Sequence, residues 1–126
     1  MSPTWPWPAD LDALHAAPAQ HRLLLENERV RVLDTEIAPG GRTPVHTHQW
    51  SAVHYVVSWS DFVRRDADGV VLVDTRSSGT KGGPLPALWG EPLPPHSLEN
   101  VGVAPLRIIS VELKAPSGAA SMSGAP

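Results

Sequence analysis

Two histidines separated by a single residue, His46 and His48, carry the clearest chemical signal in the sequence. They follow a Pro-Gly-Gly turn at residues 39–41 and lie in a segment that we expect to be a β-strand. Side chains alternate between the two faces of a strand, so both imidazoles leave the same face, about 7 Å apart. Two rings at that spacing can converge on one metal ion with bonds of about 2 Å. A third ligand must come from elsewhere, and His96 is the best candidate.

A further histidine, His54, lies two residues beyond Ala52 in the next expected strand. The two residues share the inward face, so His54 should face the same interior as the histidine pair. An imidazole titrates near neutral pH and could serve as a fourth ligand, an acid or base, or a substrate anchor. The alternative is a buried histidine that bonds only to the backbone. We take His54 as the first candidate for a catalytic group beyond the metal.

Three other residues are candidates for substrate binding. Gln49 and Trp50 follow the histidine pair at a turn and could line the mouth of the site. The alternative for Gln49 is an exposed turn residue without a role. Arg31 shares a strand face with Arg29 and could bind a substrate carboxylate through two hydrogen bonds. The alternative is that both arginines are solvated on an outer face. The remaining notable side chains are expected at the surface (His15, His21), in the core (Trp89) and away from the interior (Tyr55).

The elements that must position these residues are short strands. Runs of β-branched, aromatic and alternating residues predict strands at 21–25, 30–37, 45–48, 51–58, 61–65, 70–74, 87–89, 97–101 and 106–113. The Asp-Ala-Asp-Gly segment at 66–69 predicts a hairpin turn, and the segment 76–86, rich in Gly, Ser and Pro, predicts a loop. Regularly spaced short strands with almost no helix indicate an antiparallel sandwich or barrel.

The chain of 126 residues is long enough for one domain. Residues 1–20 are expected to form an N-terminal arm, with a short helix that Asp10 could cap, that runs to His15 or Ala17 and that Pro18 ends. Residues 21–114 should form the barrel. The low-complexity segment 115–126 should be a disordered tail.

Composition excludes several functions. A net charge of -3 and a pI of about 6.0, without a run of like charge, argue against nucleic acid as a partner. Because the chain has no cysteine, it can form neither a disulfide nor a thiolate metal site. No apolar run reaches about 18 residues, and no basic segment precedes an apolar one at the N-terminus. We therefore expect a cytoplasmic protein without a membrane partner.

Two spacings resemble the motifs of the cupin superfamily. The start of the first cupin motif is matched by Gly40, which is followed after five residues by His46 and His48. The end of the second motif is matched by His96, which is followed after three residues by Asn100. The resemblance covers about residues 24–114. It implies an all-β fold, a single-domain antiparallel jelly-roll barrel, in which His46, His48 and His96 hold a divalent metal ion. It also implies a homodimer, because small cupins commonly pair through outer strands.

Shorter matches are similar to a group of small bacterial cupins named for β-alanine degradation. They comprise residues 26–33, 46–48, 99–102 and 111–114. That name does not identify a substrate for this chain.

The chain also departs from the cupin pattern. The position of the cupin glutamate is occupied by Ala52, and the glycine that closes the first motif is replaced by Trp59. Three neutral imidazoles would leave a divalent ion its full charge and two or three open positions. Such a centre should favour anionic chelating substrates and lower the pKa of bound water toward about 7.

These features predict a metal-dependent enzyme that acts on a small organic acid or a diketone-like substrate. The first hypothesis is an Fe²⁺ dioxygenase, because a similar site without the carboxylate occurs among cupin dioxygenases that act on thiols or β-diketones. The second is a non-redox lyase, isomerase or cyclase that uses Zn²⁺, Mn²⁺ or Ni²⁺, with His54 as the base. The third is a cupin that binds a small molecule without turnover.

Overall fold

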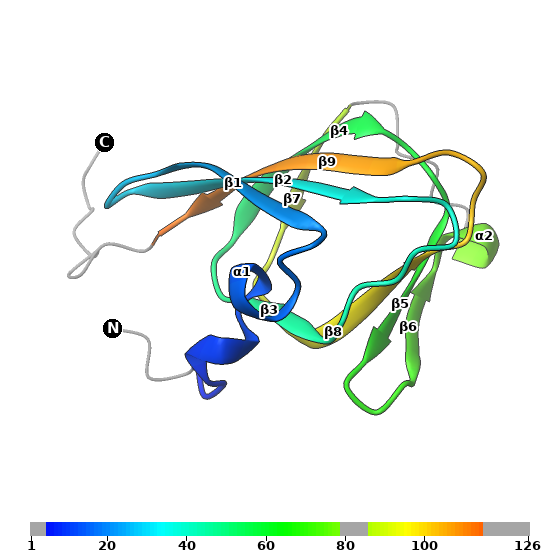
Figure 1. The fold of residues 1–126 in the computed structure, drawn as a ribbon, viewed down its shortest axis with the longest axis horizontal. Helices are drawn as coiled ribbons and strands as arrows, with labels where there is room; N and C mark the ends of the chain where they lie inside the picture. Colours follow the sequence, from blue (N-terminus) through cyan, green and yellow to red (C-terminus); the bar gives the residue numbers. More distant parts are fainter. Residues whose placement is uncertain (1–4, 79–85, 115–126) are drawn as a thin grey trace.

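The computed structural model of the protein describes residues 5–78 and 86–114, and these ranges contain nine strands and three short helices (Figure 1). The helices are η1 (Ala9–Leu11), α1 (Ala13–Ala16) and α2 (Thr75–Ser78). The strands are β1 (His21–Glu26), β2 (Val30–Ile37), β3 (His46–His48), β4 (Ala52–Ser58), β5 (Phe62–Asp66), β6 (Val71–Asp74), β7 (Ala87–Gly90), β8 (Leu93–Asn100) and β9 (Leu106–Leu113).

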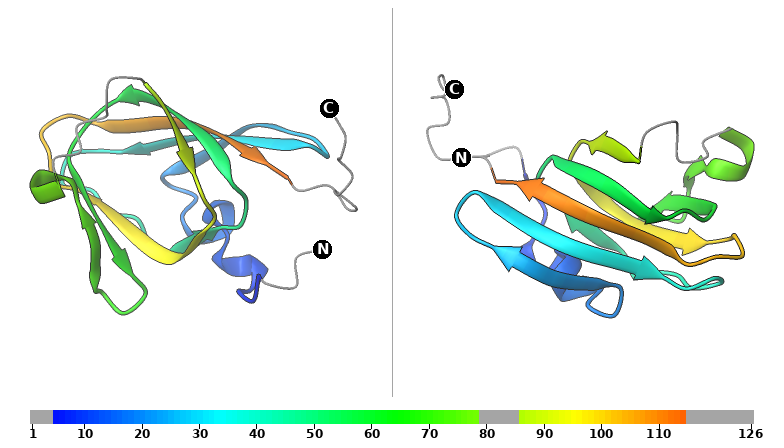
Figure 2. Two further views of the ribbon diagram at one scale, coloured as in Figure 1. Left: turned by 180° about the vertical axis from the view of Figure 1, so that it is seen from behind. Right: turned by 90° about the horizontal axis from the view of Figure 1, so that it is seen from above.

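The strands form two antiparallel sheets that face each other. The larger sheet has the order β1-β2-β9-β4-β7, and the smaller has the order β3-β8-β5-β6. In the view from above in Figure 2, the five strands of the larger sheet lie side by side in this order. Figure 1 shows the two sheets curving around a common interior. The predicted all-β barrel with a short helical N-terminal arm is therefore confirmed.

The observed strands lie close to the predicted ones, with two differences. Strand β8 begins at Leu93, four residues earlier than expected. Leu93 belongs to the strand because it pairs with His48 of β3, after an irregularity in the register between His46 and His48. The two prolines that follow Leu93 do not end the strand. The helix α2 lies in the segment expected to be a loop. It forms because the Asp74 carboxylate accepts hydrogen bonds from the Arg76 backbone N–H and guanidinium. The rest of that segment, residues 79–85, and the predicted disordered tail, residues 115–126, lie outside the described residues.

The N-terminal arm packs against two edge strands. Helix α1 contacts β1 and β3. Its cap is Asp12 and not Asp10 as predicted: the Asp12 carboxylate accepts a hydrogen bond from the Leu14 N–H at 3.1 Å, whereas Asp10 lies within η1. Ala13 and Ala17 are fully buried. Asp12 also forms a parallel bridge with Thr47 of β3. The arm therefore joins an edge of the larger sheet to an edge of the smaller one (Figure 1).

Asn100, which matches the last residue of the second cupin motif, connects strand β8 to the segments around it through its side-chain amide. Its buried amide donates hydrogen bonds to the carbonyls of Ile37 and Ala104 and accepts hydrogen bonds from the Ser60 hydroxyl and the Gly102 N–H. Because every polar atom of this amide is satisfied, its burial costs little. The role of Asn100 is structural.

The outer face of the larger sheet exposes apolar side chains. Tyr55 is 50% exposed, as expected, and Trp89, which faces outward opposite Val53, is 57% exposed. The expected core position of Trp89 is therefore wrong: on the edge strand β7 its ring lies outside and its indole N–H donates to Glu91. The homodimer stays a prediction. Among the described residues, no helix is both long enough and apolar enough to span a membrane.

Candidate metal centre

Four histidines from three strands meet inside the barrel. His46 and His48 come from β3, His96 from the paired strand β8, and His21 from the start of β1. The ring of His46 lies 4.4 Å from that of His96, 5.0 Å from that of His48 and 4.8 Å from that of His21, measured between centroids. His46 is therefore the centre of the cluster. The histidine pair shares a face, as the strand alternation predicted.

Three of these rings lie close to the spacing that a metal ion needs. One ring nitrogen from each of His21, His46 and His48 lies within 4.8 Å of the other two. Two nitrogens bonded to the same ion at about 2.1 Å are at most about 4.2 Å apart, so small ring movements suffice. His96 is somewhat more distant from His48, with ring centroids 5.7 Å apart. The predicted set of His46, His48 and His96 is thus joined by a fourth histidine.

The hydrogen bonds of His46 and His96 leave one nitrogen of each ring free. Nδ1 of His46 lies 2.8 Å from the carbonyl oxygen of Pro44, and Nδ1 of His96 lies 2.7 Å from that of Pro94. A carbonyl only accepts, so Nδ1 carries the hydrogen in both rings and Nε2 has the lone pair. Both Nε2 atoms are buried without a hydrogen-bond partner among the described residues. Buried polar atoms are rarely left unpaired, and a metal ion would satisfy both.

His21 and His48 are held in the same way. Nδ1 of His21 donates to the carbonyl of Ala17 at 3.0 Å, and Nδ1 of His48 lies 2.9 Å from a carboxylate oxygen of Glu112. A carboxylate bonded to the far nitrogen of a histidine is the usual outer support of a metal ligand, because it fixes the ring and raises the basicity of the other nitrogen. In all four rings Nδ1 is engaged in this way, so Nε2 is the nitrogen left to offer to a metal ion.

The four histidines are neutral at neutral pH. Burial lowers the pKa of His21 and His48 to about 3 and that of His96 to about 2, and it lowers the pKa of His46 as well. Metal binding requires the unprotonated imidazole. The fold therefore keeps the cluster in the protonation state that a metal ion needs.

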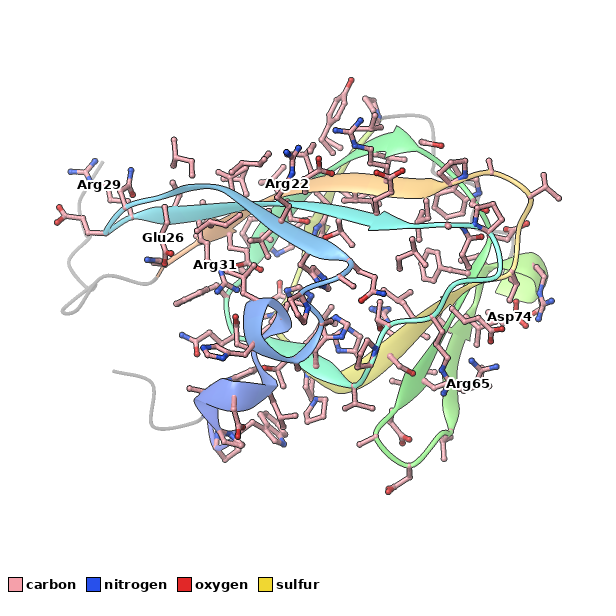
Figure 3. The ribbon with its side chains drawn as sticks, viewed as in Figure 1. Arg22, Glu26, Arg29, Arg31, Arg65 and Asp74 are labelled. Carbon is pink, nitrogen blue, oxygen red and sulfur yellow. The ribbon has the colours of Figure 1, made fainter. Side chains whose placement is uncertain are left out.

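A buried ion-pair network holds Glu112, the carboxylate that contacts Nδ1 of His48. Arg31 donates from Nε to Glu112 at 2.7 Å, and from its two terminal nitrogens to Asp12 at 2.8 and 2.9 Å. Figure 3 shows Arg31 reaching from β2 toward α1. Burial alone would lower the pKa of Arg31, but both carboxylates raise it overall. The network connects the N-terminal arm to His48 through Arg31 and Glu112.

Two expectations from the sequence are therefore corrected. His21, expected at the surface, is only 5% exposed, because the turn after α1 directs it inward. Arg31 is also 5% exposed, so the alternative that it is solvated is wrong. A substrate carboxylate could bind the planar edge of Arg31 only by displacing Asp12. The hydrogen bond from Arg31 to Glu112 indicates that Arg31 positions the Glu112 carboxylate. The sequence analysis did not identify Glu112 as a residue of the site.

Gln49 and Trp50 lie next to this network. Gln49 is exposed at the turn after β3, and Trp50 is half-buried. The Trp50 ring stacks on the Arg31 guanidinium at 5.0 Å and also contacts the Lys114 ammonium at 5.6 Å. These contacts give Trp50 a role in covering the ion pair. Substrate binding by Gln49 and Trp50 stays a prediction.

His54 faces the interior from β4, next to the buried Ala52. Its Nδ1 lies 2.7 Å from the Ser110 hydroxyl on β9, and its Nε2 has no hydrogen-bond partner among the described residues. Burial lowers the pKa of His54, so the ring is neutral at neutral pH. His54 is therefore held by a side chain and not by the backbone, and its second nitrogen is available for chemistry.

Gly90 makes room for the His54 ring. Gly90 pairs with Ala52, and a Cβ added at Gly90 would overlap Nε2 of His54. We therefore expect Gly90→Ala to destabilise the protein by about 1–3 kcal/mol through overpacking. Urea unfolding measures this cost. In the His54→Ala background the same substitution should cost almost nothing, and an equal cost in both backgrounds would contradict the assignment.

Comparisons with known proteins agree with this architecture. No protein-family model and no curated protein matches the chain. Among solved structures, a cupin domain from Bordetella pertussis is 20% identical with a TM-score of 0.59, covering 75% of this chain and 92% of that one. A conserved protein with a double-stranded β-helix domain from Klebsiella pneumoniae is 20% identical with a TM-score of 0.52, covering 74% of each chain.

A third structural neighbour is an RmlC-like cupin from Methanocaldococcus jannaschii. It is 11% identical with a TM-score of 0.50, and the match covers 74% of this chain and 77% of that one. None of these three descriptions mentions β-alanine, so that part of the resemblance stays a prediction. At these identities the likeness identifies the architecture: the chain has the double-stranded β-helix fold of the cupins.

Proposed function

We propose that the protein is a metal-dependent enzyme that acts on a small organic acid or diketone-like substrate. His21, His46, His48 and His96 would hold the ion. The observation that carries this proposal is the pair of buried Nε2 atoms of His46 and His96, which have no hydrogen-bond partner while their Nδ1 atoms are fully engaged. Buried polar atoms in proteins are usually hydrogen-bonded, so two adjacent free lone pairs support a bound ion at this place.

The donor set limits the metal and the substrate. Neutral imidazoles suit Fe²⁺, Zn²⁺ and Ni²⁺, and they also bind Mn²⁺. Four of them leave a divalent ion its full charge, so the centre favours an anionic ligand. On an ion with six ligands, four histidines would leave two positions open for substrate, whereas three histidines would leave three. When bound, the metal would supply a Lewis acid or, as Fe²⁺, the ability to activate O₂.

The chain itself would supply orientation and proton transfer. Glu112 holds the His48 ring through its 2.9 Å contact, and Arg31 holds Glu112. His54 is neutral and has a free Nε2, so it can accept or return a proton at that atom. Ser110 fixes the orientation of the His54 ring. These roles are the same for a dioxygenase and for a lyase or isomerase.

An Fe²⁺ dioxygenase remains our first candidate, since two open positions are enough for a substrate and O₂. A Zn²⁺, Mn²⁺ or Ni²⁺ lyase, isomerase or cyclase is the second, and the free Nε2 of His54 favours it because that chemistry needs a base. Elemental analysis of protein purified anaerobically, without a His-tag, tests the proposal. We expect one equivalent of metal per chain.

The identity of the metal separates the candidates. One equivalent of iron, followed by O₂ uptake with a thiol or a diketone, would support the dioxygenase. One equivalent of Zn²⁺, Mn²⁺ or Ni²⁺, with no O₂ uptake after iron reconstitution, would support the non-redox enzyme. No metal, even after reconstitution with each ion, would contradict the proposal and leave a small-molecule binding protein.

A further inference from the structure

Arg64 shares the interior face of the smaller sheet with His96. On the paired strands β5 and β8, Arg64 lies opposite Leu98, and Asp66 lies opposite His96. Side chains directly opposite each other in an antiparallel pair lie on the same face, and so do residues two apart along a strand. Arg64 and His96 are therefore on one face of the sheet.

Arg64 has no hydrogen-bond or ion-pair partner among the residues that the structure describes, and it is half-buried. The adjacent Arg65 differs: it lies on the opposite face, where it donates to Glu99 at 2.9 Å. Arg64 therefore lies on the interior side without an ion pair to any described residue, whereas Arg65 is paired on the other face.

The electrostatics agree with this position. Burial lowers the pKa of Arg64. The charge of Arg64 in turn contributes to lowering the pKa of His54, on the larger sheet, and that of His96, on the smaller one. Arg64 is therefore close to candidate catalytic and metal-binding residues of both sheets. An unpaired, partly buried cation is costly, and an anion placed beside it would remove that cost.

We propose that Arg64 binds a carboxylate of the substrate beside the candidate metal centre. This inference rests on the proposed function and narrows it. A carboxylate can accept two parallel hydrogen bonds from a guanidinium, while a second oxygen donor of the same molecule occupies the metal. The substrate class is therefore an organic acid with two anionic or oxygen-donor groups a few bonds apart, such as a dicarboxylate or a keto acid.

The interior charges support a substrate of this class. The carboxylates of Asp12 and Glu112 are both bonded to Arg31 and do not neutralise Arg64. The carboxylate of Asp66 accepts hydrogen bonds from the backbone N–H groups of Asp68 and Val70 in its own hairpin. A divalent ion and Arg64 together would thus leave an excess of positive charge, which a dianion would balance.

Malonate is a suitable probe, and calorimetric titration in a buffer of low chloride measures its binding. We expect malonate to bind the metal-free protein and to bind more tightly after Zn²⁺ loading. Arg64→Gln should weaken binding about 10- to 100-fold in both forms, which is the size of a charge-assisted hydrogen-bond pair. Arg64→Lys should lie between the two. Arg65→Gln is the matched control and should bind malonate as the wild type does.

Two outcomes would overturn the inference. One is malonate binding by Arg64→Gln within about twofold of the wild type in both forms, with an unchanged circular dichroism spectrum. The other is malonamide, the neutral analogue, binding the wild type as well as malonate does, a comparison that needs no variant. Zn²⁺ uptake is measured separately. A wild type that takes up no metal contradicts the proposed function, whereas the metal-free titration still reports on Arg64.

Discussion

His21→Ala is expected to weaken Zn²⁺ binding by more than about 100-fold, because substitution of a group that merely supports a ligand already costs 10- to 100-fold. His21 is buried against His46 and His48, with one nitrogen of each ring within 4.8 Å of the others. Its Nδ1 is bonded to the Ala17 carbonyl, so Nε2 is the atom that the substitution removes from the centre.

Competition with a coloured chelator measures the affinity. His15→Ala is the matched control, because His15 is exposed on α1 and should leave the affinity unchanged. His96→Ala, in the same series, should lose affinity to a similar extent. If His21→Ala binds Zn²⁺ within about threefold of the wild type while His96→Ala does not, the metal is held by the three histidines that the sequence predicted.

The strands could be predicted because their signals are local. Alternation, β-branched residues and Gly/Asp turns act over a few residues, and the observed boundaries of β2, β4 and β9 differ from the predicted ones by at most one residue. The relation between His46 and His48 was predictable for the same reason. Their spacing alone places both rings on one face, whatever the rest of the fold does.

His21 and Glu112 could not be predicted in this way. His21 reaches the centre because β1 pairs with β2 and because the α1 arm connects β1 to the edge of β3, which are properties of the topology. Glu112 lies 64 residues from His48, and Arg31 lies 81 residues from Glu112. Alternation indicates which residues of a strand share a face, but not which face is inside. A sequence therefore suggests Arg31 on an outer face as readily as on an inner one.

Arg31→Met is expected to destabilise the metal-free protein by about 3–5 kcal/mol, the usual cost of removing one partner of a buried ion pair. Arg31 is the only described hydrogen-bond donor to one oxygen of Glu112, whose side chain is 1% exposed, and it also pairs with Asp12. Without Arg31, burial would raise the pKa of Glu112 further, and the carboxylate would take up a proton or draw in water.

Urea unfolding in the presence of EDTA measures this loss without a contribution from metal binding. Arg29→Met is the control, because Arg29 is exposed and its substitution should change the free energy of unfolding by no more than about 0.5 kcal/mol. The double variant Arg31→Met/Glu112→Leu removes the stranded charge, so it should be more stable than Arg31→Met alone. A double variant that is less stable would mean that Glu112 contributes through His48 rather than through Arg31. The network would then stabilise the protein mainly by holding His48 and less by attaching the N-terminal arm.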